Sequence, residues 1–248
     1  MLHLHKIRDN LFLGDINSAS QVLIGGEYGS KEKITHMLSV WEKPSMEFFT
    51  ELIPDYSVVP SKVIRTVYTE ESGSDKKIHY VLENAGHDLN LVRMAVPLKD
   101  TEGANLLDNL DVCLDFIDQA RKNGSVLVHC YAGLSRSASV ITAYLMRSER
   151  LSAQDALESL RQIKPYVFPN DGFLQQLAMF EEMGFKVDHS SPVYKRFRGK
   201  VLGPGDVLSL WAQDVWCKVS RLMLPTPDCK EAPSQAPDEP TQPDKPDL

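Results

Sequence analysis

One cysteine and one arginine in the segment VLVHCYAGLSRSAS (126–139) stand at a spacing that suits phosphate chemistry. Cys130 follows a short apolar run, Arg136 comes six positions later, and Gly133 lies between them. A loop of this length, the cysteine loop (130–136), can curl so that its backbone N–H groups converge, and glycine permits the bend. A following helix N-terminus adds to the positive field, and the Arg136 guanidinium matches two phosphate oxygens. The segment therefore predicts a phosphate-binding loop with a thiol beneath the phosphate.

The same loop would make Cys130 a nucleophile, because thiolates are stabilised at helix N-termini and beside arginine. A cysteine at a strand end is by itself more often a buried core residue, and only the joint pattern with Gly133 and Arg136 favours chemistry. Ser137 either donates a hydrogen bond to the sulfur or is a plain serine at a helix start. His129 is expected to be a core histidine that shapes the loop.

Cleavage of a phosphoester by a thiolate also requires a general acid that protonates the leaving oxygen. Asp100 lies in VPLKDTEGAN, directly after an apolar run, where a loop would share the rim of the cysteine loop. Asp88 precedes that run, while Asp108 and Asp111 fall in the next helical pattern and suit a solvated face. We therefore assign the acid to Asp100, with a helix cap as its alternative role.

Short apolar runs alternate with helical patterns along the chain. They predict strands at 11–13, 34–40, 90–96 and 125–129, and helices at 105–121, 137–148, 152–164 and 171–183. Ser152 and Asn170 are expected to cap the last two helices, and Gly184 to follow the last. This order predicts an α/β fold, a three-layer sandwich with a mainly parallel central sheet flanked by helices.

Residues 41–87 are the part of the folded region that the sequence explains least. The polar stretch TEESGSDKK (69–77) reads as an excursion from the sheet. A long excursion in a compact domain is usually functional or mobile, and the residues do not decide which.

Composition separates a folded part from the C-terminal end of this 248-residue chain. Residues 225–248 hold 7 of the 15 prolines with six acidic and two basic residues, so −4 of the net charge of −7 lies there. Such a segment is predicted to be disordered. Residues 206–223 carry apolar side chains at helical spacing, which indicates a helix that either docks on the folded part or meets a partner. We expect a catalytic domain at 1–186, an extension at 187–224 and the tail at 225–248.

Charge and cysteine usage exclude several classes. The acidic balance argues against a nucleic-acid binder. No apolar run approaches the ~18 residues needed to span a bilayer, and the 206–223 pattern has too few cations for a lipid surface. The cysteines are too widely spaced for a disulfide framework or a zinc pair; they are Cys113, Cys130, Cys217 and Cys229. We expect a soluble protein of a reduced compartment, the cytoplasm or the nucleus or both.

These motifs carry a resemblance to the dual-specificity phosphatases of the cysteine-dependent protein tyrosine phosphatase superfamily. HCYAGLSRS resembles the family's catalytic loop and LKDTEGANL its general-acid loop. NLFLGDINSAS resembles its opening strand and helix, ITHMLSV its second strand, and PNDGFLQQL its closing helix. The resemblance covers about residues 5–185, apart from 41–87, which are longer than in most members. It implies hydrolysis of phosphotyrosine and phosphoserine or phosphothreonine through a phosphocysteine.

The resemblance implies the same roles that the chemistry suggested: Cys130 as nucleophile, Arg136 as phosphate clamp, Asp100 as acid and then base, and Ser137 as thiolate helper. It also implies phosphate-binding N–H groups in the loop, those of Tyr131, Ala132, Gly133, Leu134 and Ser135. No metal or other cofactor is needed, because the loop, the arginine and the helix dipole supply the positive field. The loop has no lysine, which favours phosphoproteins over polyanionic head groups. The Tyr131 ring either contacts substrate or packs.

The segment EEMGFKVDHSSPVYKRFR (181–198) resembles a subgroup, plant members especially, that continues into a cysteine-rich zinc-binding region. Only Cys217 and Cys229 follow Arg198, so we expect no zinc site. Two other function classes stay as alternatives. A phosphoprotein-binding scaffold would usually lack the nucleophile, the acid or the arginine, and all three are present. Arsenate reduction would need further redox cysteines, whereas Cys113 is expected in the core.

Overall fold

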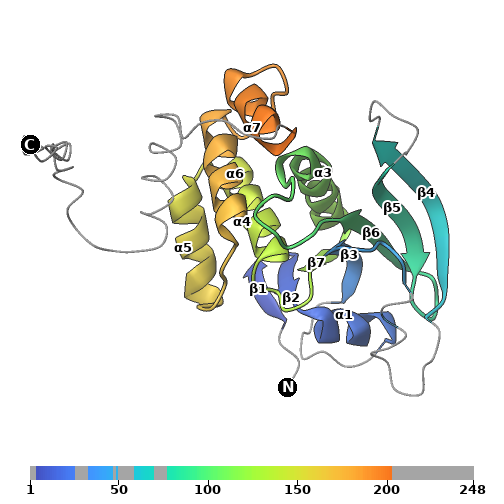
Figure 1. Cartoon of the computed structure of the whole chain (residues 1–248). Helices are drawn as coiled ribbons and strands as arrows, with labels where there is room; N and C mark the ends of the chain where they lie inside the picture. Colours follow the sequence, from blue (N-terminus) through green and yellow to red (C-terminus); the bar gives the residue numbers. More distant parts are fainter. Residues whose placement is uncertain (1–3, 26–32, 47–48, 50–58, 70–76, 203–248) are drawn as a thin grey trace, which may run out of the picture.

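The computed structural model describes residues 4–25, 33–46, 49, 59–69 and 77–202 (Figure 1). Their strands are β1 (His5–Arg8), β2 (Leu11–Gly14), β3 (Ile34–Trp41), β4 (Ser61–Thr69), β5 (Lys77–Ala85), β6 (Leu91–Pro97) and β7 (Ser125–His129). Their helices are α1 (Ile16–Leu23), α3 (Leu107–Asn123), α4 (Arg136–Glu149), α5 (Ala153–Ile163), α6 (Asp171–Glu182) and α7 (Pro192–Leu202). The helix predicted at 206–223 and the tail at 225–248 lie outside the described residues.

The strands form one sheet in the order β1-β2-β7-β3-β6-β5-β4. The four in the middle, β2, β7, β3 and β6, are parallel neighbours. Antiparallel pairs are added at both edges, β1 on β2 and the hairpin β4–β5 on β6. The predicted α/β sandwich is confirmed, and its parallel part is the centre of the sheet. The loops that leave β7, β3 and β6 consequently meet at one rim.

The long excursion expected at 41–87 is wrong for residues 61–69 and 77–85, while most of the polar stretch 69–77 lies outside the described residues. Residues 61–69 and 77–85 form β4 and β5, and β5 extends the sheet through pairs such as Val81 with Ala95 of β6. The pairing between β4 and β5 shifts register between Val63 and Arg65 and again between Val67 and Tyr68. These irregularities break the two-residue alternation by which a strand is recognised in sequence.

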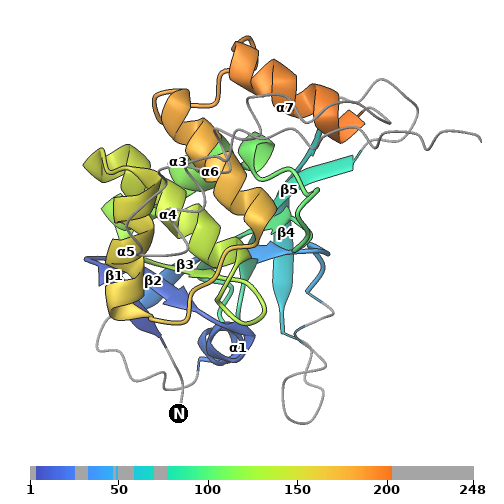
Figure 2. The same cartoon turned by 60° about the vertical axis from the view of Figure 1, so that its left-hand side comes forward.

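Alternate residues of the central strands enter two separate cores. Leu11, Leu13, Val126 and Val128 belong to the larger core, which the helices α3 to α7 cover. Phe12 and Leu127 face the smaller core under α1. Figures 1 and 2 show α1 on one side of the sheet and α3, α4, α5 and α6 on the other. This double coverage explains why every residue of β2 and β7 is buried.

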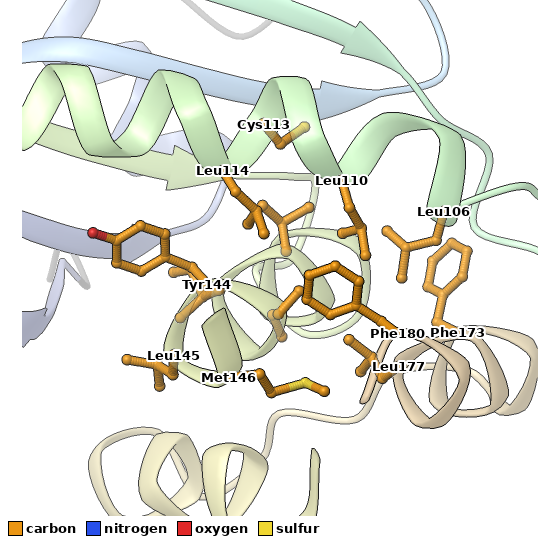
Figure 3. Close-up of a cluster of buried hydrophobic side chains, with 14 of the residues drawn as sticks. Leu106, Leu110, Cys113, Leu114, Tyr144, Leu145, Met146, Phe173, Leu177 and Phe180 are labelled. Atoms are coloured by element: carbon orange, nitrogen blue, oxygen red, sulfur yellow. The ribbon is translucent and has the colours of Figure 1, made fainter. Parts of the chain in front are cut away.

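The helical layer is built around α4, which packs between α3 and α6 (Figure 3). The side chains buried between these three helices include Leu110, Cys113, Leu114, Tyr144, Leu145, Met146, Phe173, Leu177 and Phe180. Cys113 is fully buried, and this burial raises the pKa of its thiol to about 12. The core position predicted for Cys113 is confirmed.

The helix boundaries follow the predicted caps. The Ser152 hydroxyl accepts a hydrogen bond from the Asp155 N–H at 3.0 Å, and α5 begins at the next residue. The Asn170 side chain accepts from the Phe173 N–H at 2.9 Å at the start of α6. Gly184 adopts the left-handed conformation with φ +73° just beyond α6, where glycine is favoured. None of the described helices combines the length and the apolar character that a membrane crossing requires.

Helix α7 is an element that the sequence patterns did not predict. Val193, Tyr194 and Phe197 are buried in the larger core. The Tyr194 hydroxyl donates a hydrogen bond to Asp108 in the first turn of α3, and Arg198 lies 3.6 Å from the same carboxylate. Asp108 therefore anchors α7 rather than serving as a solvated residue of α3.

Candidate active site

The cysteine loop joins the buried strand β7 to the first turn of α4. Cys130 directly follows the strand and is 2% exposed, and Arg136 is the first residue of the helix. The Ser137 hydroxyl donates a hydrogen bond to Cys130 Sγ at 3.1 Å. The structure thus places a hydroxyl donor and the N-terminal end of a 14-residue helix at the sulfur.

The backbone carbonyls of the loop bond to neighbouring segments. Tyr131 O accepts from Ile16 N at 2.9 Å, and Leu134 O accepts from Phe168 N at 2.8 Å. Because a trans peptide holds its N–H opposite to its C=O, the N–H groups of Ala132 and Ser135 point away from these neighbouring segments. These N–H groups are the donors that a phosphate would require.

Gly133 is required by the shape of the loop. Its φ is +68°, and a Cβ there would lie 2.5 Å from Gly14 O and 2.6 Å from Lys164 Nζ. Lys164 Nζ donates to Gly133 O at 2.9 Å, so a cation supports the loop from behind. Partial burial lowers the pKa of Lys164. The contact of Lys164 with the loop was not predicted from the sequence, which placed this residue only at the end of a helix.

Arg136 lies over an aromatic ring and beside a carboxylate. Its side chain is 9% exposed, and its Cζ atom stands 4.4 Å from the centroid of the Trp41 ring. The Arg136 Nε is buried and makes no hydrogen bond, and the nearest carboxylate oxygen, Asp100 Oδ2, is 3.5 Å away. A buried guanidinium that lacks a hydrogen bond has capacity for an anionic ligand.

Asp100 lies in the acid loop (98–106), which follows β6, at the same rim as Cys130. Its Oδ1 accepts hydrogen bonds from Ser135 Oγ at 2.6 Å and Asn170 Nδ2 at 2.9 Å. Both of these contacts involve Oδ1, while Oδ2 is the oxygen nearer to Arg136. The sequence predicted Asn170 only as a helix cap, and the structure adds its contact with Asp100.

The acid loop is docked on the start of α6. A Cβ at Gly172 would lie 2.0 Å from Glu102 O, so the backbones touch there. Gln176 Nε2 donates to Ala104 O at 2.8 Å, and Gln176 Oε1 accepts from Leu106 N at 2.7 Å. These contacts fix the loop that carries Asp100.

Behind the loop, a chain of hydrogen bonds ends at the backbone carbonyl of Cys130. His129 Nδ1 lies 3.1 Å from the Cys130 carbonyl oxygen, which only accepts, so Nδ1 carries the proton. Nε2 must then accept from Ser39 Oγ, at 2.7 Å, and Ser39 Oγ in turn accepts from Arg93 Nε at 2.8 Å. Burial lowers the pKa of His129 to about 3, which keeps the ring neutral. The predicted core role of His129 is confirmed.

Arg93 connects this chain to the edge hairpin (β4 and β5). It is 1% exposed and forms an ion pair with Glu83 of β5, itself 3% exposed. Arg93 NH1 also donates to Pro44 O at 3.3 Å. No sequence pattern indicated this pair, because its two members come from different strands and neither follows a motif.

The fold and this site together define a cysteine-loop α/β protein, and comparisons with known proteins agree. The model of the dual specificity phosphatase catalytic domain matches residues 65–183. Human dual specificity protein phosphatase 12 is 46% identical over 110 residues, which are 44% of this chain and 32% of that protein. Protein 123R of Invertebrate iridescent virus 6, named as a tyrosine phosphatase, is 36% identical over 132 residues, 49% of this chain and 92% of the viral protein.

Solved structures show the same architecture. The crystal structure of DUSP15 matches with a TM-score of 0.52 and 23% identity over 79% of this chain and 96% of that chain. The Yvh1 phosphatase domain from Chaetomium thermophilum matches with a TM-score of 0.50 and 25% identity over 76% of this chain and 99% of that chain. The chain belongs to the dual-specificity phosphatase family. It spans about a third of the length of the phosphatase 12 relatives that it matches. The expected likeness to plant members stays a prediction.

Proposed function

We propose that the protein hydrolyses phosphotyrosine and phosphoserine or phosphothreonine in proteins through a phosphocysteine intermediate. The observation that carries this proposal is the convergence of three groups on one rim. Cys130 Sγ accepts from Ser137, Arg136 lies at the start of α4, and Asp100 Oδ2 is 3.5 Å from the arginine. A phosphate bound between them would meet a nucleophile, a clamp and an acid.

In the first step, the Cys130 thiolate attacks phosphorus and the bond from phosphorus to the substrate oxygen breaks. Asp100 gives a proton to that leaving oxygen, which departs as an alcohol or phenol. The Arg136 guanidinium and the N–H groups of the loop stabilise the charge on the three remaining phosphoryl oxygens.

In the second step, a water molecule attacks the phosphocysteine and the bond from sulfur to phosphorus breaks. The Asp100 carboxylate now takes a proton from the water and returns to its acid form. The electron pair stays on Cys130 Sγ, where the Ser137 hydroxyl donates its hydrogen bond to the leaving thiolate. Inorganic phosphate is released.

Phosphoproteins are the partners that this proposal implies, and nucleic acid and membranes are not part of it. The cysteine loop contains no lysine between Cys130 and Arg136, which supports a singly phosphorylated side chain over a polyanionic head group. We retain the cytoplasm, the nucleus or both as the proposed location.

The test measures phosphate release from phosphotyrosine and phosphothreonine peptides by the full chain and two cysteine variants. Wild type should cleave both peptides, Cys130→Ser should release no phosphate, and Cys113→Ala should keep wild-type activity because Cys113 lies in the helical core. Vanadate, a phosphate mimic, should inhibit. A folded wild-type protein that binds phosphopeptide but cleaves neither peptide would instead support the scaffold alternative.

A further inference from the structure

We propose that Trp41 is a positioning residue that holds the Arg136 guanidinium in the orientation required for phosphate binding. This inference rests on the proposed function, since it assigns a role within the same site. The Trp41 ring lies 4.4 Å from Arg136 Cζ, and no family motif quoted above includes this residue.

The topology of the sheet puts Trp41 between the two functional loops. Strand β3 lies between β7 and β6, and all three are parallel. The cysteine loop leaves β7, the acid loop leaves β6, and Trp41 is the last residue of β3. A side chain at this position is therefore next to both loops by the order of the strands alone.

Three contacts of Trp41 bear out this placement. Its carbonyl oxygen accepts a hydrogen bond from Leu98 N at 2.9 Å, at the start of the acid loop. Its ring lies beside the Tyr131 ring with a centroid separation of 5.3 Å and an interplanar angle of 32°. Its third contact is the one with Arg136. One residue thus joins the acid loop, the first residue after the nucleophile, and the start of α4.

The Trp41 ring matters for Arg136 because polar contacts hold the Nε side of the guanidinium only weakly. Its Nε atom makes no hydrogen bond, and its ion pair with the Asp100 carboxylate is long, at 3.5 Å. A flat aromatic face attracts a guanidinium and orients its plane without occupying its N–H donors. The donors consequently stay available for two phosphate oxygens.

Tyr131 strengthens this arrangement from the other direction. Its side chain is half exposed, while its backbone is fixed through the bond from Ile16 N to Tyr131 O. The Tyr131 ring packs beside the Trp41 ring, and cation–π attraction grows when the pair is desolvated. The Tyr131 ring is thus assigned to packing against Trp41.

The first experiment compares Trp41→Leu and Trp41→Phe in the full chain, with Tyr68→Leu as the matched control. Tyr68 is an aromatic residue of β4 that is 50% exposed. Trp41→Leu should weaken vanadate inhibition and lower kcat/KM about five- to thirtyfold, the range that a partly desolvated cation–π contact allows. Trp41→Phe should recover part of the loss, and Tyr68→Leu should match wild type.

The loss should be equal for phosphotyrosine and phosphothreonine peptides, since both present the same phosphoryl group to Arg136. A purely structural role would lower the melting temperature and leave the vanadate inhibition constant unchanged below it. The proposal is overturned if Trp41→Leu keeps both the vanadate constant and kcat/KM within twofold of wild type.

A second readout does not depend on turnover. Vanadate bound by Arg136 should change the fluorescence of Trp41, and the other two tryptophans, Trp211 and Trp216, lie outside the described residues. The full chain should show a saturable change on titration with vanadate that Trp41→Phe lacks. The same change in both proteins would count against the proposal. A wild type that gives this signal without cleaving peptides would contradict only the proposed function.

Discussion

The parallel centre of the sheet and its edge hairpin use the same kind of structure for different purposes. The strands β2, β7, β3 and β6 are covered on both faces. Cys130 follows β7, Trp41 is the last residue of β3, and Asp100 lies in the loop after β6. The hairpin instead exposes apolar side chains such as Val63 and Ile64 and contributes one buried charge, Glu83. The chemistry that we propose therefore depends on the parallel strands, because their carboxyl ends share one rim and bring Cys130 and Asp100 together. The hairpin contributes support through Arg93.

Among these predictions, the largest loss of kcat is expected when Asp100, the proposed general acid, is replaced. Asp100→Asn keeps the size of the side chain but removes the proton donor, so kcat should fall by about 10²–10⁴ for phosphothreonine peptides. The loss should be smaller for p-nitrophenyl phosphate, because its leaving oxygen needs no proton. Asp88→Asn, at an exposed aspartate before β6, is the control and should match wild type. Equal losses on both substrates would contradict the acid role.

The second prediction concerns the pH dependence of stability at His129. Its pKa is about 3 in the folded protein against 6.5 in the unfolded chain, so the unfolded chain binds the extra proton between these values. The stability gained by burying the neutral ring is complete above pH 6.5. It is lost as the pH falls toward 3, by at most about 1.4 kcal/mol per pH unit.

Urea unfolding at pH 7, 6 and 5 measures this slope. His129→Gln should flatten the dependence on pH, whereas His87→Gln, at an exposed histidine, should leave it as in wild type. Parallel curves for wild type and His129→Gln would refute the assignment.

The third prediction breaks the link between the two regions. Ser39→Ala leaves Arg93 Nε without an acceptor and His129 Nε2 without a donor, which should lower the free energy of unfolding by about 1–3 kcal/mol. It should also lower kcat, because His129 no longer has a fixed orientation behind Cys130. Ser20→Ala is the matched control: Ser20 Oγ bonds only to a carbonyl within α1, at 2.8 Å. A fall in stability with unchanged kcat would separate the hairpin from the site.

The smallest effect is expected on the outer surface of the hairpin. Ile64 is 55% exposed, so Ile64→Ser should change the free energy of unfolding by no more than about 0.5 kcal/mol and kcat/KM by less than twofold. Denaturant unfolding and peptide kinetics check both values. A larger kinetic loss would mean that this surface takes part in substrate binding.

The same comparison explains how much the sequence could predict. The central strands were found because runs such as SVLVH are mostly apolar; Cys130 follows this run directly, and Arg136 and Asp100 follow their runs within seven positions. The hairpin was missed because its register irregularities break the alternation of apolar residues. The caps Ser152 and Asn170 were predictable from local sequence.

The supporting residues of the site could not be found in this way. Trp41, Arg93 and Lys164 act through contacts that span 10 to 95 positions in the chain, from the ion pair of Arg93 with Glu83 to the contact of Trp41 with Arg136. Their roles depend on which strands are neighbours, and a single sequence does not state the strand order. Helix α7 belongs to the same class, since its anchor is Asp108, 86 positions from Tyr194.

The contact between Gly172 and the Glu102 carbonyl has a consequence for how the protein meets its substrate. The acid loop is held against α6 before a substrate binds, because Gly172 has no side chain to keep the two backbones apart. The acid loop itself then needs no closing movement when substrate binds, and turnover should not slow as the solvent is made more viscous. The added methyl group of Gly172→Ala would push the acid loop away from α6. Asp100 would then have to be brought back to the rim each time a substrate binds.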